Sequence, residues 1–224
     1  MRRAPRLVGL CILFSPFLAM GRPPGTRHAR FQHVSWNVQT LANATSTRRA
    51  RQKLSSLACH LKDVDVFFLQ EVHGDDQYVI DLMRPLSDKF AFEYSATANE
   101  ISGGVLTAWS KAWAGTATVQ HAPIVPGRVL ISTFRFQDTE LRFGSVHNFG
   151  ITNAQSQDIH NRMAADWDWM SARPEQRAAL WSGDWNIGLP DWIATTWNAQ
   201  SFHVPGYPVT FPEPSTTFRK VWTA

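Results

Sequence analysis

Cysteine is scarce in this chain, with only Cys11 and Cys59 among 224 residues. Cys11 lies in an N-terminal segment with the features of a cleavable leader, so its removal would leave Cys59 without an intrachain partner. Cys59 falls on the apolar side of a helical pattern, which indicates a small buried hydrophobic side chain rather than a disulfide position. Repeats and low-complexity tracts are also absent from the sequence.

Acidic residues are missing from residues 1–30, which hold six of the chain's 22 Lys and Arg residues. The remaining 16 basic residues face 18 Asp and Glu in residues 31–224, a net charge of −2 for that part. The overall net charge of +4 and the pI near 9.4 therefore come from the basic N-terminal segment, and residues 31–224 are not basic. Charge alone gives no argument for nucleic-acid binding, and any such argument must come from a site.

The chain has no long hydrophobic run of the kind that crosses a membrane. The apolar stretch 7–20 is shorter than the roughly 20 residues that a span requires, and Pro16 interrupts it. A basic start followed by this stretch and by Ala19 and Gly21 fits a secretory signal peptide over residues 1–21. The unpartnered Cys59 counts against secretion, so a non-native N-terminus is an equal alternative, and both a secreted and an intracellular location stay open.

Length and composition predict one large domain with a substantial core. Hydrophobic residues make up 44% of the chain, with ten Trp among them, which excludes disorder throughout. We place the domain at residues 31–224 and treat residues 1–30 as a separate leading segment. "VDVFFL" (64–69) is apolar except for Asp65, a pattern typical of a strand buried on both faces. Helices are predicted over 48–61, 77–86 and 154–170, and strands over 33–38, 64–69, 90–94, 105–109, 116–120, 129–136, 141–146 and 178–181.

This order of elements indicates an α/β fold: two mixed β-sheets packed as a sandwich, with helices on the outer faces. Polar side chains close four of the predicted strands. Asn37 ends the first strand and Glu71 follows "VDVFFL"; His147 ends "LRFGSV", and Asp184 and Asn186 follow "AALW" after a predicted turn at Ser182-Gly183. Taken singly, each is an ordinary turn, cap or structural residue. Because groups at the ends of several strands meet at one rim of a sheet, their recurrence predicts a shared site.

These side chains suit phosphoester chemistry that depends on a divalent cation. Mg²⁺ prefers oxygen ligands, so Glu71 is the expected metal ligand and Asn37 a neutral oxygen beside it, with Mn²⁺ as a substitute ion. Asp184 can orient or deprotonate an attacking water, and Asn186 can donate hydrogen bonds to phosphate oxygens. His147 can protonate the leaving oxygen or bind developing charge.

The same residues resemble the motifs of the endonuclease/exonuclease/phosphatase superfamily, which includes DNase I and exonuclease III. "SWNVQTL" resembles its first motif, "VDVFFLQEV" the second, "SGGVLTAWSK" the glycine-led strand, "SVHNFG" the histidine motif and "SGDWNIG" the Gly-Asp-Phe-Asn motif. The five occur in order between residues 31 and 188. The resemblance implies a two-sheet sandwich, Mg²⁺ dependence and hydrolysis of phosphodiesters or phosphomonoesters.

The chain departs from the family pattern at its end. The family finishes with Ser-Asp-His, whose Asp binds metal and whose His contacts the scissile phosphate, and this sequence reaches Ala224 without that motif. "TTFRKVW" (216–222) resembles the segment just before the family's last strands, so we expect those strands to be missing and activity to be low.

We therefore interpret the chain as a Mg²⁺-dependent phosphoesterase domain. The preferred interpretation is a nuclease acting on nucleic acid, and a retrotransposon-type endonuclease fragment is one form of it. One alternative is a phosphatase acting on a phospholipid, inositol phosphate or nucleotide. The other is a non-catalytic remnant or binding module that keeps the fold.

Overall fold

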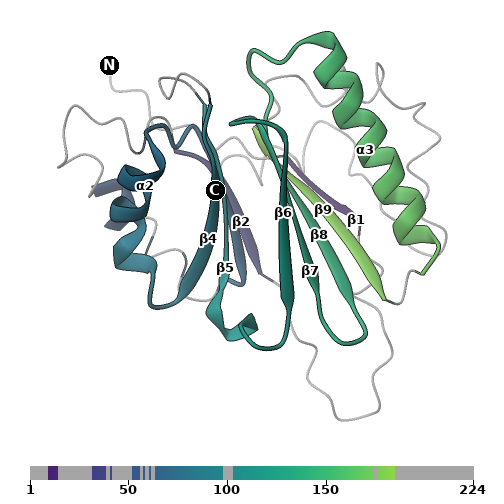
Figure 1. Cartoon of the computed structure of the whole chain (residues 1–224), viewed down its shortest axis with the longest axis horizontal. Coiled ribbons are helices and arrows are strands. Elements are labelled where there is room, and N and C mark those ends of the chain that lie inside the picture. The colour runs from purple at the N-terminus through teal and green to yellow at the C-terminus, as the bar shows by residue number, and fades with distance from the viewer. Residues whose placement is uncertain are drawn as a thin grey trace, which may run out of the picture.

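The computed structural model describes residues 10–14, 32–38, 41, 52–55, 58, 61, 64–97, 103–173 and 176–184. Two sheets lie between helices α2 and α3 (Figure 1). The first has the order β2-β3-β5-β4 and the second the order β1-β9-β8-β7-β6. The predicted α/β sandwich of two mixed sheets, with helices on the outside, is confirmed. The strands are β1 (Leu10–Phe14), β2 (His33–Asn37), β3 (Val66–Gln70), β4 (Phe90–Ser95), β5 (Val105–Ser110), β6 (Thr118–Val125), β7 (Val129–Arg135), β8 (Glu140–His147) and β9 (Arg177–Asp184).

The first sheet is built around β3, in which every residue is buried. β3 pairs in parallel with β2 and antiparallel with β5, as its unbroken apolar run predicts for a central strand. Helix α2 (Asp76–Met83) begins at Asp75, whose carboxylate accepts a hydrogen bond from the Tyr78 amide at 2.7 Å. Val79 and Met83 of α2 pack against Phe67 of β3 in the outer cluster of this sheet.

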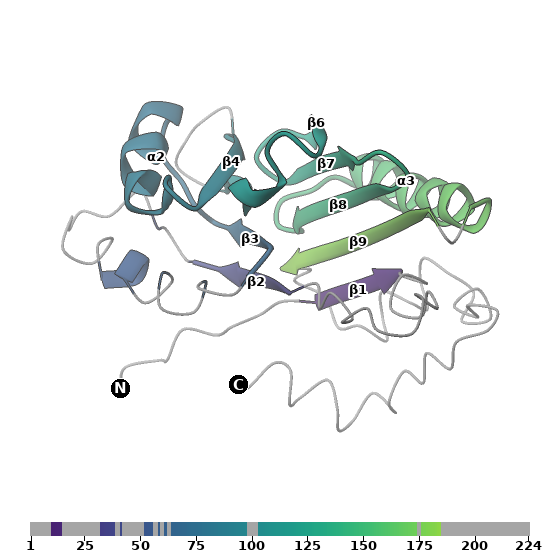
Figure 2. The ribbon, with the colours of Figure 1, turned by 90° about the horizontal axis from the view of Figure 1, so that it is seen from below.

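The second sheet carries α3 (Asn153–Ser171) on its outer face, where Ile159 and Met163 pack against Trp181. Thr152 and Gln155 form a capping box that fixes the start of this helix. The chain is drawn from below in Figure 2, where β8 and β9 run side by side beneath α3. These two strands are parallel, so their C-terminal ends reach the same rim of the sheet.

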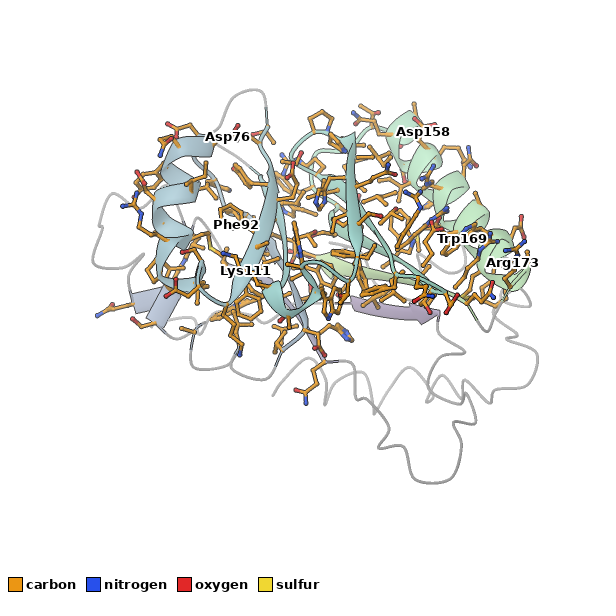
Figure 3. The ribbon with its side chains drawn as sticks, turned by 60° about the horizontal axis from the view of Figure 1, so that its bottom comes forward. Asp76, Phe92, Lys111, Asp158, Trp169 and Arg173 are labelled. Carbon is orange, nitrogen blue, oxygen red and sulfur yellow. The ribbon has the colours of Figure 1, made fainter. Side chains whose placement is uncertain are left out.

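The sheets meet through an aromatic layer at one end of the sandwich. Phe68 of β3 lies 5.9 Å from Phe143 of β8, centroid to centroid, and Phe134 lies 5.3 Å from the same ring. Side chains fill the space on both sides of each sheet (Figure 3); Phe92 belongs to the α2 cluster and Trp169 to the α3 cluster. The inner faces are therefore apolar at this end, and their polar residues gather toward the opposite end.

Several element boundaries differ from the predicted ones. β6 starts at Thr118 and runs to Val125, beyond the predicted 116–120, and the predicted helix 77–86 ends as a 3-10 turn, η2 (Arg84–Leu86). Ser182-Gly183 lies inside β9 and is not a turn, because β9 stays in register with β8 through His147↔Asp184. The strand therefore carries Asp184 itself.

The N-terminal stretch contributes one feature that the sequence pattern did not predict. Leu10–Phe14 forms β1, which pairs antiparallel with β9 at the edge of the second sheet. Residues 52–55 are helical, as expected within the predicted helix 48–61, and most of that helix lies outside the described residues. Among the described residues, no helix is long and apolar enough to cross a membrane.

Candidate active site

Four of the five predicted site residues meet where the two sheets open at one end of the sandwich. Asn37, His147 and Asp184 are the last residues of β2, β8 and β9, and Glu71 directly follows β3. His147 and Asp184 are register partners on neighbouring strands. Asn186 lies outside the described residues. Both sheets thus contribute to one cluster, defined here as Asn37, Glu71, His147 and Asp184.

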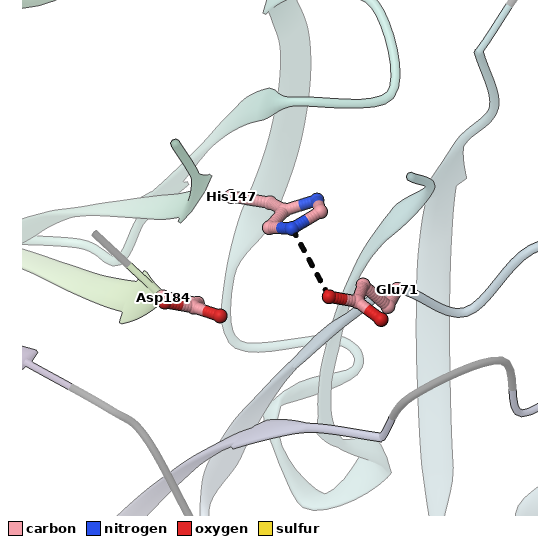
Figure 4. Close-up of side chains that lie close together, drawn as sticks. All are labelled: Glu71, His147 and Asp184. Atoms are coloured by element: carbon pink, nitrogen blue, oxygen red, sulfur yellow. Dashed lines mark ion pairs between the residues drawn. The ribbon is translucent and has the colours of Figure 1, made fainter. Parts of the chain in front are cut away.

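Asn37 links the two acids of this cluster. Its Nδ2 donates to Glu71 Oε1 at 2.8 Å and to Asp184 Oδ2 at 2.7 Å. One ligand atom from each of Glu71, His147 and Asp184 lies within 4.8 Å of the other two (Figure 4). Asn37, His147 and Asp184 are almost completely buried, while the Glu71 side chain keeps 29% of its surface exposed. Two carboxylates are therefore held close together at a partly open end of the core.

The backbone around Glu71 is turned sharply to place its side chain. Glu71 and His73 have φ angles of 56° and 59°, a left-handed conformation that costs roughly 1–2 kcal/mol for a residue with a Cβ. The turn is held by two hydrogen bonds, from Val72 N to Gly104 O and from His73 N to Gly103 O, both 3.1 Å. The glycine-led strand of the third sequence motif thus fixes the loop that carries the metal-binding candidate.

Neighbouring donors keep Glu71 ionised. The contact with His147 and the Asn37 amide lower the pKa of Glu71 to about 2, against the opposing effect of burial. Glu71 therefore carries its negative charge at neutral pH and well into the acid range. A partly buried carboxylate that stays charged is a strong attractor for a cation.

Arg128 determines the tautomer of His147. Arg128 NH1 lies 2.9 Å from His147 Nδ1, and a guanidinium can only donate. Nδ1 is therefore the acceptor, and the ring proton of neutral His147 sits on Nε2. Nε2 lies 3.4 Å from Glu71 Oε1, and no described residue accepts a well-directed hydrogen bond from it. His147 thus offers an N–H donor to the site rather than a lone pair.

Arg128 and His73 are site residues that the sequence pattern missed. Arg128 follows the turn residue Gly127, between β6 and β7. Its guanidinium reaches the site by contacting His147. His73 is buried, its Nδ1 has no hydrogen-bond partner in the described part of the chain, and burial lowers its pKa. The one sequence signal for Arg128 is the Pro-Gly-Arg turn at 126–128, a common surface pattern.

A layer of serines lies beneath the cluster. Ser35, Ser145 and Ser182 each precede a site residue by two positions and so face the same side of their strands. Ser145 and Ser182 are register partners with no exposed surface, and within the described residues neither hydroxyl has a hydrogen-bond partner. Ser35 instead exchanges hydrogen bonds with Gln70 at 3.2 and 3.4 Å. The inner faces of the sheets therefore become polar before they reach the site.

The sequence matches the endonuclease/exonuclease/phosphatase family over residues 34–223. The chain belongs to this family. The matched region includes the whole cluster and all five motifs. The comparison with curated proteins gives no significant match.

Solved structures of family members share the fold at low sequence identity. TDP2 of D. rerio in complex with a single-strand DNA product is 22% identical, with a TM-score of 0.51 over 74% of this chain and 64% of that one. The mannosyl-6-phosphatase Bt3783 of Bacteroides thetaiotaomicron is 14% identical, with a TM-score of 0.54 over 76% of this chain and 71% of that one. The AP endonuclease LMAP of Leishmania major is 16% identical, with a TM-score of 0.53 over 80% of this chain and 62% of that one.

Members of the family typically depend on a divalent metal, and the cluster has the donors to hold one. Glu71 and Asp184 supply carboxylate oxygens, which suit a hard cation such as Mg²⁺ or Mn²⁺, and the Asn37 amide nitrogen holds the two carboxylates together. His147 belongs to the same group by distance, but its Nε2 carries the proton and has no lone pair for a metal. The geometry thus separates an oxygen-rich cation position from an adjacent hydrogen-bond donor.

Proposed function

We propose that this family member hydrolyses phosphodiester bonds of nucleic acid with the help of a divalent cation, Mg²⁺ or Mn²⁺. The observation that supports this most strongly is the Asn37 amide nitrogen between two carboxylates, 2.8 Å from Glu71 and 2.7 Å from Asp184. Two carboxylates held close together by a neutral amide donor leave a concentrated negative charge, which favours a bound cation. The Arg128–His147 pair adds a positive group and a directed donor on the other side.

In this proposal each residue of the cluster has its own task. Glu71 and Asn37 hold the cation, which when bound would neutralise charge on the phosphate oxygens. Asp184, at the end of β9, orients the attacking water and accepts its proton. His147 donates from Nε2 to a phosphate oxygen or to the leaving oxygen, and Arg128 keeps the ring in the tautomer that can do so.

Asn186 keeps a proposed role from the family motif. It follows Asp184 by two residues in "SGDWNIG" and would donate its side-chain amide to a phosphate oxygen. Asp184 is the last residue of β9 and belongs to the cluster, and Asn186 is close to it in the sequence. This is the reason to test Asn186 together with His147.

Relatives with this fold include both nucleic-acid enzymes and a phosphatase, so the substrate class must be tested directly. The test compares a phosphodiester, bis(p-nitrophenyl) phosphate, with the monoester p-nitrophenyl phosphate, each with and without Mn²⁺. We expect hydrolysis of the diester that needs the cation, however slow, and that is lost in Asp184→Asn. Asp168→Asn, an exposed acid on α3, is the matched control.

Two results would count against this function. Faster cleavage of the monoester than of the diester would favour the phosphatase alternative. Cleavage that persists without a cation, or in Asp184→Asn, would remove the cluster from the chemistry.

A further inference from the structure

Phe149 is the most exposed large apolar side chain of the described residues, and it stands beside the cluster. Its exposed fraction is 59%, compared with 48% for Ile80 and 38% for Tyr78, both on α2. Single exposed apolar side chains are common and need no function. Phe149 differs from the other two in its position, since only Asn148 separates it from His147 in the chain.

Hydrogen bonds hold the backbone at Phe149 against the site. The Phe149 amide donates to the His147 carbonyl at 2.9 Å, and the preceding amide of Asn148 donates to the Asp184 carbonyl at 2.7 Å. Gly150 follows with φ +65°, a left-handed turn that directs the chain away. The ring is therefore exposed on a backbone that is fixed to two residues of the cluster.

The ring itself is oriented by its neighbours. Phe149 stacks on His147 with centroids 6.0 Å apart and an interplanar angle of 13°. The Arg128 guanidinium lies 5.7 Å from the Phe149 centroid while it also bonds to His147. One face of an aromatic ring is thus supported by the site, and a positive charge lies next to it.

We propose that Phe149, whose ring also contacts the Arg128 guanidinium, is a stacking platform for the base of the nucleotide next to the scissile phosphate. This inference rests on the proposed function and names its substrate class: a nucleic acid in which that base is unpaired. A base must leave its duplex neighbours to stack on a protein ring, so single-stranded or locally opened substrate is favoured. Base–aromatic stacking accepts every base, so the platform predicts little sequence preference at this position.

The test measures binding of two short fluorescein-labelled single-stranded oligonucleotides by anisotropy, with Ca²⁺ in place of Mg²⁺. One carries ordinary bases, and the other has tetrahydrofuran abasic sites at all central positions. Stacking of one base typically changes affinity by about 5- to 100-fold, so the wild type should prefer the base-bearing strand by that ratio. Phe149→Leu, which is apolar but not aromatic, should bring the ratio close to one, and Phe149→Trp should keep it.

The outcomes separate this inference from the proposed function. An unchanged ratio in Phe149→Leu, with its melting temperature equal to that of the wild type, overturns the platform. If neither strand binds the wild type while hydrolysis of bis(p-nitrophenyl) phosphate still requires Asp184, the platform fails and the function stands. If that hydrolysis is absent while Phe149→Leu abolishes the base preference, the function fails and the platform stands.

Discussion

Arg128 donates to Nδ1 of His147 across 2.9 Å, and this bond decides which nitrogen of the imidazole faces Glu71. The two residues are 19 positions apart: Arg128 is in the turn just before β7, and His147 ends β8, the strand that pairs with β7. The pair also shares a backbone bond, from His147 N to Arg128 O at 2.7 Å. The proton donor of the site is thus set by a residue that none of the sequence motifs contains.

The first prediction concerns this tautomer. In the wild type at pH 8, ¹⁵N-detected NMR should show His147 with its proton on Nε2. Arg128→Met removes the donor and keeps an unbranched, flexible side chain, so a mixture of the two tautomers should appear. His121, which contacts Ser132 and not Arg128, is the internal control and should not change. A proton on Nδ1 in the wild type would contradict the proposed role of His147.

Gly103 should not tolerate a side chain. A Cβ there would lie 2.7 Å from Arg128 NH1, and its φ of +94° is unfavourable for any other residue. Gly103→Ala should cost about 2–3 kcal/mol of unfolding free energy and displace Arg128 from His147. Gly115→Ala is the matched control, since Gly115 has φ +83° and nothing within 4 Å. Urea unfolding should show the larger loss for Gly103→Ala, and equal losses would mean that the contact with Arg128 has no effect.

Asp166 fastens α3 to the second sheet. Its buried carboxylate accepts from Arg142 NH1 at 2.9 Å and from Trp181 Nε1 at 3.1 Å. Asp166→Ala should destabilise the fold by about 2–3 kcal/mol, because it leaves the buried indole N–H without its acceptor and Arg142 with only Glu140, at 3.4 Å. Asp168→Ala, on the exposed side of the same helix, should change stability by less than about 0.5 kcal/mol in the same urea titration. A similar small effect for Asp166→Ala would show that the network does not hold the helix.

Stability should fall on mild acidification because of His121, a partly buried histidine. Burial lowers the pKa of His121 to about 4, so the folded state binds fewer protons than the unfolded state between pH 6.5 and 4. Its contribution is complete above pH 6.5 and is lost as the pH falls through that window. Because His121 is only partly buried, solvent screening reduces the effect, and between pH 7 and pH 5 we expect a loss of less than about 1 kcal/mol from this residue. His121→Gln should flatten the slope of stability against pH, and an unchanged slope would mean that His121 protonates freely in the fold.

Much of the fold could be predicted from the sequence because its strands are strongly patterned. The run at 64–69 marked a doubly buried strand, and polar residues at successive strand ends marked one rim. The end of β9 was less clear: Ser182-Gly183 has turn composition, but pairing with β8 keeps it extended. Tertiary pairing overrode local preference there, and it also placed Leu10–Phe14 beside β9.

The site was predictable where chain position alone carried the information. Asn37, Glu71, His147 and Asp184 could be grouped because strand order brings their ends together. Arg128 could not be assigned to the site from the sequence, since its role depends on its side chain pointing from a turn toward His147. The serines two residues before Asn37, His147 and Asp184 are a further sequence signal of the polar inner face. Period-two spacing places each serine on the same face of its strand as a site residue.

The central claim is that the cluster binds a divalent cation through Glu71, and calorimetric titration of Mn²⁺ tests it most directly. Wild type and the variants Glu71→Gln and Asn37→Ala are titrated at pH 7, with circular dichroism to confirm that each is folded. Loss of the carboxylate charge should weaken binding by at least about tenfold, and loss of the neutral amide should weaken it less. That order of affinities is the predicted result; equal affinity in wild type and Glu71→Gln would contradict the account.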